Sequence, residues 1–289
     1  MKLIVISGRS GSGKSTVLRA LEDAGYDCLD NFPVMLLQSL VHTSLRNPNQ
    51  ANANLAVCID ARSRDLERFP EILMSIDRMD VDCQVIFLDA RSPTLVMRFS
   101  ETRRRHPLTD ANTDLRQAID AEQEVLESIV DMADLTIDST NLSSQQLRAL
   151  VSERVTTNLN PGISLLFRSF GFKKGVPVDA DLVFDLRCLP NPHWESGLRP
   201  LSGLDSPVQD YLNGKDMVEE MFNDISSYLH TWIPKFEANA RVYMTIALGC
   251  TGGQHRSVYM AERLGAHFAE QFPNVLVRHR EMAADTPAS

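Results

Sequence analysis

GRSGSGKS, at residues 8–15, decides the fold of the N-terminal half. It matches the phosphate-binding pattern G-x-x-x-x-G-K-[ST] at every position. The apolar run Leu3–Ile6 precedes it, as a buried strand would, and Lys14–Ala24 has the spacing of an amphipathic helix that ends at Gly25. A strand, a glycine-rich turn and a helix in this order predict a P-loop. The alternative, a glycine-rich turn that binds nothing, does not explain this context.

The residue types of this loop suit a nucleotide with a magnesium ion. Glycine lets the backbone approach phosphate oxygens closely, and the N-terminus of the following helix adds partial positive charge. Lys14 is expected to reach the β- and γ-phosphates, and the Ser15 hydroxyl is the expected metal ligand. We therefore predict ATP or GTP as the cofactor, together with Mg²⁺.

A P-loop site also needs a carboxylate at the end of a neighbouring strand, where it holds the metal through water. Asp60 follows the apolar run LAVCI, and Asp89 follows QVIFL. Either residue is equally compatible with an ordinary turn, the commoner role of aspartate. We expect Asp89 to be the metal-associated carboxylate and the loop from Asp60 to Ser63 to lie beside the base or the phosphates.

These expectations define the first site. Its predicted catalytic residues are Lys14, Ser15 and Asp89. Its predicted cofactor-binding residues are Gly8, Arg9, Ser10, Gly11, Ser12, Gly13, Lys14, Ser15, Asp60, Ala61, Arg62 and Ser63.

A basic cluster, Arg103–Arg105 followed by His106, precedes Pro107. Such a cluster can close over the γ-phosphate, as the lids of small P-loop kinases do, or bind an acidic partner. A solvated helix end is equally compatible with it, because charged runs usually face water.

Strands and helices alternate along both halves of the chain. Alternation of this kind predicts an α/β fold, with parallel sheets covered by helices. The polar segment TTNLNPG is the clearest linker. We expect a P-loop nucleotide-binding domain at 1–155, a linker at 156–162 and a second α/β domain at 163–289.

The second domain contains another loop with the chemistry of a phosphate site, ALGCTGGQHRS at residues 247–257. Its C-x-x-G-x-x-R-S form is found in cysteine phosphatases, in which a thiolate attacks phosphorus and an arginine binds the phosphoryl oxygens. Without catalysis, a Gly-Gly turn at a helix N-terminus remains a good anion site. The remaining alternative is a buried strand-end cysteine and a surface arginine.

Polar residues after the predicted strand Asp181–Leu186 are expected to face this loop, because ligands bind at the carboxyl ends of parallel strands. The predicted ligand-binding residues of the second site are Asp185, Asn191, His193, Cys250, Thr251, Gly252, Gly253, His255 and Arg256.

The composition excludes several classes of protein. The net charge of −9 argues against a protein that coats nucleic acid without specificity. Five scattered cysteines without a CxxC pair argue against a zinc site or a disulfide framework. No apolar run approaches the roughly 18 residues of a membrane span. These features predict a cytoplasmic protein.

Together the motifs resemble the RapZ/YvcJ family of RNase adapter proteins. The matching stretches are SGRSGSGKS (7–15), LEDAGYDCLDNFP (21–33), SETRRRHPL (100–108), SFGFKKGVPVDADLVFDLRCLPNP (169–192) and GCTGGQHRSVYMAERL (249–264). The resemblance implies ATPase and GTPase activity and a homo-oligomer. It also implies an adapter that presents a small RNA to an endoribonuclease and senses glucosamine-6-phosphate.

The resemblance also implies roles for individual residues. It places Asp60–Ser63 in a guanine-nucleotide element, and it places His193, Thr251, Gly252, His255 and Arg256 around the sugar phosphate. Enterobacterial members have a basic C-terminal tail, whereas this chain ends in EMAADTPAS. Since phosphate contacts by Lys and Arg dominate RNA affinity, we expect weaker RNA binding here.

Three hypotheses follow. The chain is a nucleotide-hydrolysing regulatory protein that senses a phosphorylated metabolite, or an RNA-binding adapter. Alternatively it is an enzyme, either a small-molecule P-loop kinase or a cysteine phosphatase.

Overall fold

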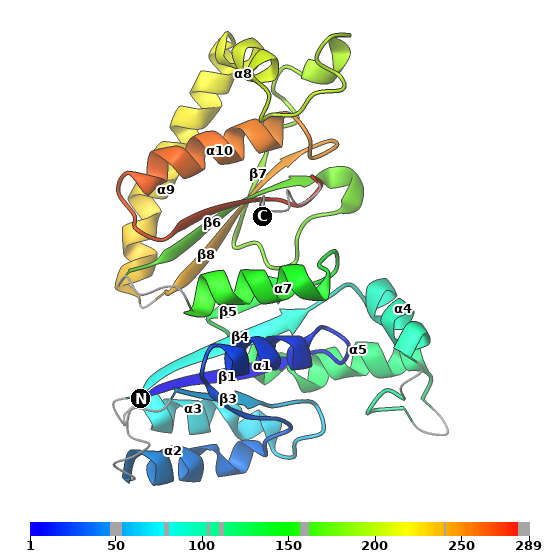
Figure 1. Ribbon diagram of the computed structural model, residues 1–289, viewed down its shortest axis with the longest axis vertical. Helices are drawn as coiled ribbons and strands as arrows, with labels where there is room; N and C mark the ends of the chain where they lie inside the picture. Colours follow the sequence, from blue (N-terminus) through cyan, green and yellow to red (C-terminus); the bar gives the residue numbers. More distant parts are fainter. Residues whose placement is uncertain are drawn as a thin grey trace. The chain divides into compact units, whose positions relative to one another are not determined.

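The computed structural model describes residues 1–46, 54–77, 81–102, 105–109, 113–156, 162–239 and 241–282. The chain divides into two compact units, Met1–Thr157 and Asn158–Ser289. Each unit contains its own parallel β-sheet, and helices pack against each sheet (Figure 1). The predicted α/β fold is confirmed in both units.

Unit 1 contains a five-stranded sheet in the order β2-β3-β1-β4-β5. All its strand pairs are parallel. Apolar, β-branched runs form the central strands, which suits strands that are buried on both faces. The strands are β1 (Lys2–Gly8), β2 (Asp27–Leu29), β3 (Asn54–Cys58), β4 (Asp82–Asp89) and β5 (Leu135–Asp138).

Helices cover both faces of this sheet, with α1 and α7 on one side and α2 and α3 on the other (Figure 1). Side chains that alternate along the strands, such as Leu3 and Val5, pack with α2, α3 and α6. The helices are α1 (Lys14–Asp23), α2 (Leu37–Arg46), α3 (Phe69–Asp77), α4 (Ser92–Thr102), α5 (Leu115–Val125), α6 (Glu127–Val130) and α7 (Ser144–Val151).

The start of two helices is fixed by local side-chain bonds. Asp114 accepts from the backbone N–H of Gln117 before α5, and Ser143 accepts from that of Gln146 before α7. In both cases the glutamine returns a bond, which completes a capping box. These caps position α5 behind the P-loop and α7 beside the pocket described below.

Unit 2 contains a four-stranded parallel sheet in the order β7-β8-β6-β9. Its central strands β6 and β8 are buried along their whole length. One sheet face packs with the three helices in a single apolar core. The elements are β6 (Ser164–Gly171), β7 (Leu182–Asp185), α8 (Ser206–Asn213), α9 (Asp216–Ala238), β8 (Tyr243–Cys250), α10 (Arg256–Ala269) and β9 (Val275–His279).

The strand register of unit 2 gathers the second predicted site at one edge. Gly171 at the end of β6 pairs with Cys250 at the end of β8, and Asp185 at the end of β7 pairs with Gly249. The turns that follow these three strands therefore meet at the carboxyl edge of the sheet.

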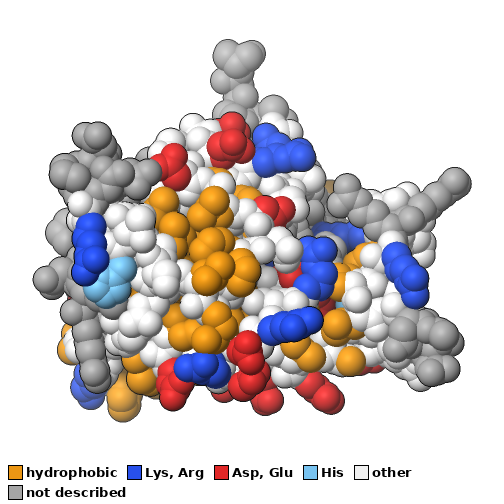
Figure 2. All heavy atoms as spheres, turned by 90° about the horizontal axis from the view of Figure 1, so that it is seen from below, with side chains coloured by type: hydrophobic (Ala, Val, Ile, Leu, Met, Phe, Trp, Pro, Cys, Tyr) orange, Lys and Arg blue, Asp and Glu red, His pale blue; other side chains and the backbone are white. Residues whose placement is uncertain are grey.

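Hydrophobic side chains also reach the surface. Figure 2 shows a group of them among charged residues on one face of the molecule. Met35, Leu36 and Met74 are exposed hydrophobic residues of unit 1. Apolar atoms make up much of any protein surface, so this exposure alone does not define a site. Among the described residues, no helix has the length and apolarity needed to cross a membrane.

Candidate functional site

The loop at residues 8–15 connects β1 to α1 and has the backbone of a phosphate-binding turn. Gly8, Gly11 and Gly13 have φ values of +145°, +85° and +109°, which side-chain-bearing residues rarely adopt. Lys14 folds back over the loop, where its Nζ donates to the carbonyl oxygen of Gly8 at 2.6 Å. The loop therefore presents an ammonium group and the free N-terminus of a helix on one side.

Gly8 is required by the close approach of β1 to β4. A Cβ atom at this position would lie 2.1 Å from the carbonyl oxygen of Leu88. Gly25 also has a positive φ, but a Cβ there would meet nothing within 4 Å. A side chain at Gly8 would meet both steric overlap and backbone strain, whereas a side chain at Gly25 would meet backbone strain alone.

We expect Gly8→Ala to destabilise the protein by more than about 3 kcal/mol, because it adds overlap with backbone to a strained φ. This corresponds to a fall in melting temperature of at least about 6 °C. Gly25→Ala, with strain alone, should cost only about 1–2 kcal/mol. Thermal unfolding of both variants checks this prediction, and equal shifts would contradict it.

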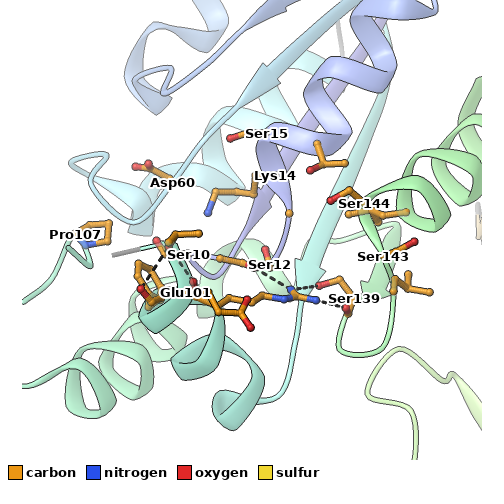
Figure 3. Close-up of a pocket in the computed structure, with 18 of the residues that line it drawn as sticks. Ser10, Ser12, Lys14, Ser15, Asp60, Glu101, Pro107, Ser139, Ser143 and Ser144 are labelled. Carbon is orange, nitrogen blue, oxygen red and sulfur yellow. Dashed lines mark hydrogen bonds between the residues drawn. The ribbon is translucent and has the colours of Figure 1, made fainter. Parts of the chain in front are cut away.

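A cavity of about 610 Å³ opens beside the loop (Figure 3). Its volume lies within the usual range for small-molecule sites. Figure 3 shows Asp60 and Pro107 on one side of Lys14, and Ser139, Ser143 and Ser144 on the other. The lining residues are Ser10, Gly11, Ser12, Gly13, Lys14, Ser15, Thr16, Asp60, Arg62, Arg98, Phe99, Glu101, Thr102, Arg105, Pro107, Ser139, Leu142, Ser143, Ser144 and Leu147.

Asp60 is the strand-end carboxylate that lines this cavity. Arg62 donates to it from its backbone N–H and from its guanidinium, with Nε at 2.9 Å. Burial raises the pKa of Asp60, but the bonds from Arg62 and the charge of Lys14 outweigh this and hold the pKa below its ordinary value. Asp60 is therefore an ionised carboxylate in the same cavity as Lys14 and Ser15.

Asp89 is placed differently. Its carboxylate pairs with Nε of Arg9 at 2.6 Å and accepts from the backbone N–H of Ala90 at 2.7 Å. Neither Asp89 nor the Arg9 side chain lines the cavity. The pair instead holds the outer side of the P-loop against the end of β4.

The loop after β8 forms the second site. Cys250 is 3% exposed, and its Sγ lies 3.2 Å from both the backbone N–H of Gly253 and the hydroxyl of Ser257. Burial raises the pKa of the Cys250 thiol, but bonds from Ser257 and Gly253 and the charge of Arg256 outweigh this, so that the pKa is lowered. The thiol site is thus adapted to hold negative charge.

Arg256 begins α10 beneath this loop and is 4% exposed. Its Nη1 donates to the carbonyl oxygens of Arg187 and Leu189 at 3.0 and 2.9 Å. Its Nε is buried and has no hydrogen-bond partner among the described residues. The turn after β7 therefore fixes the guanidinium at the start of α10, and its positive charge there suits an oxyanion at the loop.

Two histidines flank the loop. His255 is 6% exposed, and its Nε2 lies 3.2 Å from the carbonyl oxygen of Leu198. Burial is the main cause that lowers the pKa of His255. The ring of His193, which is exposed, lies 6.3 Å from that of His255 between centroids. The loop therefore has one buried and one exposed imidazole at its edge.

Family models match both units. The model of the RapZ-like N-terminal domain matches residues 1–159, and that of the RapZ C-terminal domain matches residues 163–283. The chain belongs to the RapZ family. A nucleotide-binding protein of Pseudomonas putida (strain GB-1) is 54% identical over 98% of this chain and 100% of its own length. A nucleotide-binding protein of Stutzerimonas stutzeri (strain A1501) is 53% identical, with the same coverage.

Solved structures similar to this RapZ-family chain include two kinases. A shikimate kinase from Bacteroides thetaiotaomicron is 14% identical with a TM-score of 0.36, over 52% of this chain and 98% of that one. A thymidylate kinase from Candida albicans is 16% identical with a TM-score of 0.31, over 54% and 91%.

The first site of this RapZ-family chain contains most of the residues that the sequence suggested. Ser10 to Ser15 and Asp60 with Arg62 line the cavity, whereas Gly8, Ala61 and Ser63 do not. Ser63 instead accepts from the backbone N–H of Val34 at 3.1 Å. Of the basic cluster, Arg105 lines the cavity, and Arg103 and Arg104 lie outside the described residues.

Sequence reasoning did not place Arg98 at the nucleotide site. This residue of α4 donates to the carbonyl oxygen of Gly11 at 2.9 Å and to the hydroxyl of Ser139 at 3.0 Å. It thus joins the P-loop to the turn after β5, at the cavity wall. Its position inside a helix gave no signal, because both partners are more than 40 residues away.

At the second site the predicted residues share one sheet edge. Thr251 and Gly252 are exposed, and Thr251 accepts from Nη2 of Arg256 at 3.4 Å. Asp185 is exposed and pairs with Arg187 at 2.6 Å. Asn191 accepts from the backbone N–H of His193 at 3.4 Å. Asp185 and Asn191 therefore already bond within their own loop.

Proposed function

We propose that this RapZ-family protein binds and slowly hydrolyses ATP or GTP in unit 1 and binds a phosphorylated amino sugar in unit 2. The observation that carries the first part is a P-loop whose residues Ser10 to Ser15 line a cavity of nucleotide size. The relatives are named nucleotide-binding proteins, which also supports nucleotide binding in unit 1.

The donor set of the first cavity fits a nucleoside triphosphate with Mg²⁺. Lys14 would exchange its bond to Gly8 for the β- and γ-phosphates, while Arg98 and Arg105 would add positive charge. Ser15 and, through water, Asp60 would hold the magnesium ion. When bound, Mg²⁺ neutralises charge on the phosphate oxygens.

Hydrolysis would join a water oxygen to the γ-phosphorus and break the bond to the β–γ bridging oxygen, which gives the nucleoside diphosphate and phosphate. Asp60 is the buried acid of the cavity, but Arg62 keeps it ionised and hydrogen-bonded. A carboxylate held in this state accepts a proton poorly. We therefore expect slow turnover.

We expect Asp60→Asn to lower magnesium-dependent hydrolysis about 10- to 100-fold, the usual cost of losing a group that supports a metal. Nucleotide binding without magnesium should change less than about twofold, since Lys14 and the loop are untouched. Asp89→Asn is the comparison variant, because Asp89 is the other strand-end carboxylate and pairs with Arg9 outside the cavity. Phosphate release measured against magnesium concentration distinguishes the two; a larger loss in Asp89→Asn would restore Asp89 to the metal role.

The same assay separates hydrolysis from a small-molecule kinase. The cavity has lining residues on both sides of Lys14 (Figure 3), and a kinase would bind a phosphoryl acceptor there beside the nucleotide. Nucleoside diphosphate formed with an equal amount of phosphate supports hydrolysis. If more nucleoside diphosphate than inorganic phosphate is formed, the γ-phosphoryl group has been transferred to an acceptor.

Glucosamine-6-phosphate is our proposed ligand for unit 2. Its phosphate would lie at the Thr251–Gly253 turn, at the N-terminus of α10, near the guanidinium of Arg256, whose Nη2 donates to the Thr251 hydroxyl. His193 and His255 would contact the sugar, and Asp185 is an exposed carboxylate that could accept from its ammonium. Although the lowered pKa of Cys250 favours a thiolate, the side chain is only 3% exposed, and we do not propose covalent catalysis there. Among the described residues no contact specifically favours RNA, so we do not propose RNA binding.

A further inference from the structure

A buried carboxylate lies directly behind the P-loop. Glu122, on α5, is fully buried. Its two oxygens accept from the backbone N–H of Ser10 at 2.7 Å and from the Ser10 hydroxyl at 2.7 Å. A third bond joins it to Nε2 of His106 at 3.1 Å. A buried charge is retained only where such bonds compensate its lost hydration, so this cluster is a specific arrangement.

The charge of Glu122 is maintained by these neighbours. Burial raises the pKa of Glu122, but the bond from His106, the charge of Lys14 and the bonds from Ser10 outweigh it and lower the pKa. The ionised Glu122 therefore accepts from all three donors. A glutamine in its place could not accept from all three, because it has one acceptor oxygen and its NH₂ group only donates.

His106 faces the carboxylate with its donor nitrogen. Its Nδ1 lies 3.2 Å from the backbone N–H of Leu108, so Nδ1 accepts and Nε2 carries the proton toward Glu122. The ring also packs on Phe99, with centroids 5.1 Å apart. Both the tautomer and the orientation of His106 follow from its partners.

His106 belongs to a short arm, residues 105–109, that reaches the nucleotide cavity. Arg105 donates to the hydroxyl and the carbonyl oxygen of Thr109 at 3.3 and 3.1 Å. The Thr109 hydroxyl donates to the carbonyl oxygen of His106 at 2.7 Å. Contacts therefore run continuously from Arg105, at the cavity wall, through Thr109, His106 and Glu122 to Ser10 of the P-loop.

We propose that Glu122 and His106 are positioning residues that tie this arm to the P-loop and so hold Arg105 at the nucleotide cavity. This inference rests on the proposed nucleotide site. It predicts that the contribution of Arg105 to nucleotide affinity depends on Glu122, although Glu122 is buried behind the loop.

A double-mutant cycle in the full-length chain tests this dependence. The probe is the β,γ-imido analogue of ATP or GTP, whichever binds the wild type more tightly, titrated by calorimetry. We expect Arg105→Ala to weaken affinity about tenfold, as for one charge-assisted bond, and Glu122→Gln to weaken it by a similar factor. The double variant should be no weaker than the weaker single variant. Multiplied effects, or wild-type affinity in Glu122→Gln, would overturn the proposal.

Two substitutions of His106 provide a rescue that does not depend on Glu122→Gln folding. Asparagine can replace Nδ1 as the acceptor for Leu108 but cannot reach Glu122, whereas glutamine can replace the Nε2 donor. We expect His106→Asn to weaken binding about tenfold and His106→Gln to stay within about threefold of wild type. The reverse order would contradict a tether through Glu122, because general destabilisation has no reason to favour glutamine.

Titration of Lys14→Ala with the same probe distinguishes failure of the proposed nucleotide site from failure of the positioning inference. If Lys14→Ala binds as wild type does, the proposed nucleotide site fails and the tether loses its function. If Lys14→Ala loses binding while the Arg105 and Glu122 effects multiply, only the positioning inference fails.

Discussion

Lys14→Ala is expected to weaken nucleotide binding about 10- to 150-fold, because it removes a charge-assisted hydrogen bond worth about 1.5–3 kcal/mol. The ammonium group lies within the P-loop, where its Nζ contacts the Gly8 carbonyl oxygen. It is the lysine that lines the cavity, and the substitution leaves the backbone N–H groups in place. Calorimetric titration with magnesium-bound ATP and GTP measures the loss.

Lys2→Ala is the matched control for this variant. Lys2 lies in unit 1, at the start of β1, and contacts the carbonyl oxygen of Val155 at 3.4 Å, away from the cavity lining. It changes the net charge by the same amount, so a general charge effect would appear in both variants. Affinity within about twofold of wild type in Lys14→Ala would contradict the P-loop assignment.

Arg256→Ala should weaken binding of glucosamine-6-phosphate by a comparable factor, about 10- to 150-fold. Arg256 is a buried arginine at the N-terminus of α10, beside the Thr251–Gly253 turn. Its loss also frees the carbonyl oxygens of Arg187 and Leu189, so the turn after β7 loses support. Titration of the full-length chain with the sugar phosphate measures the effect.

Two further variants separate ligand contact from support of the turn. Arg256→Lys keeps the charge but loses the planar set of donors, and it should recover only part of the affinity. Arg263→Ala removes an arginine from the same helix that pairs with Glu219, and it should bind normally. If Arg256→Ala binds as tightly as Arg263→Ala, the anion site is wrongly placed.

The central strands and the P-loop could be predicted from sequence because each depends on local pattern. Buried runs such as LAVCI and QVIFL gave β3 and β4, and a motif with fixed spacing gave the loop. The short edge strand β2 has no buried residue, so no hydrophobic pattern identified it. Leu126 divides the helical stretch that begins at Leu115 into α5 and α6.

The choice between Asp60 and Asp89 could not be made from sequence. Both follow apolar strands, and β3 and β4 both flank β1. Arg9, which is 80 positions away in the sequence, engages Asp89 and leaves Asp60 in the cavity. Glu122 was missed for the same reason, since its partner Ser10 lies 112 positions away.

The sequence alone grouped the residues of the second predicted site more readily than those of the first. Strand ends in a parallel sheet share an edge, so Asp185 and Cys250 could be grouped without knowing the strand order. The burial of Arg256 was not predictable, because carbonyl oxygens from the turn after β7 enclose it. Arg256 is therefore buried, whereas the sequence alone was equally compatible with a solvated arginine.

The most direct test of two independent anion sites is one set of calorimetric titrations. Wild type, Lys14→Ala and Arg256→Ala are each titrated with the magnesium-bound nucleotide and with glucosamine-6-phosphate. We predict that wild type binds both ligands together, that Lys14→Ala loses only the nucleotide, and that Arg256→Ala loses only the sugar phosphate. Competition between the ligands, or loss of both in either variant, would contradict the account.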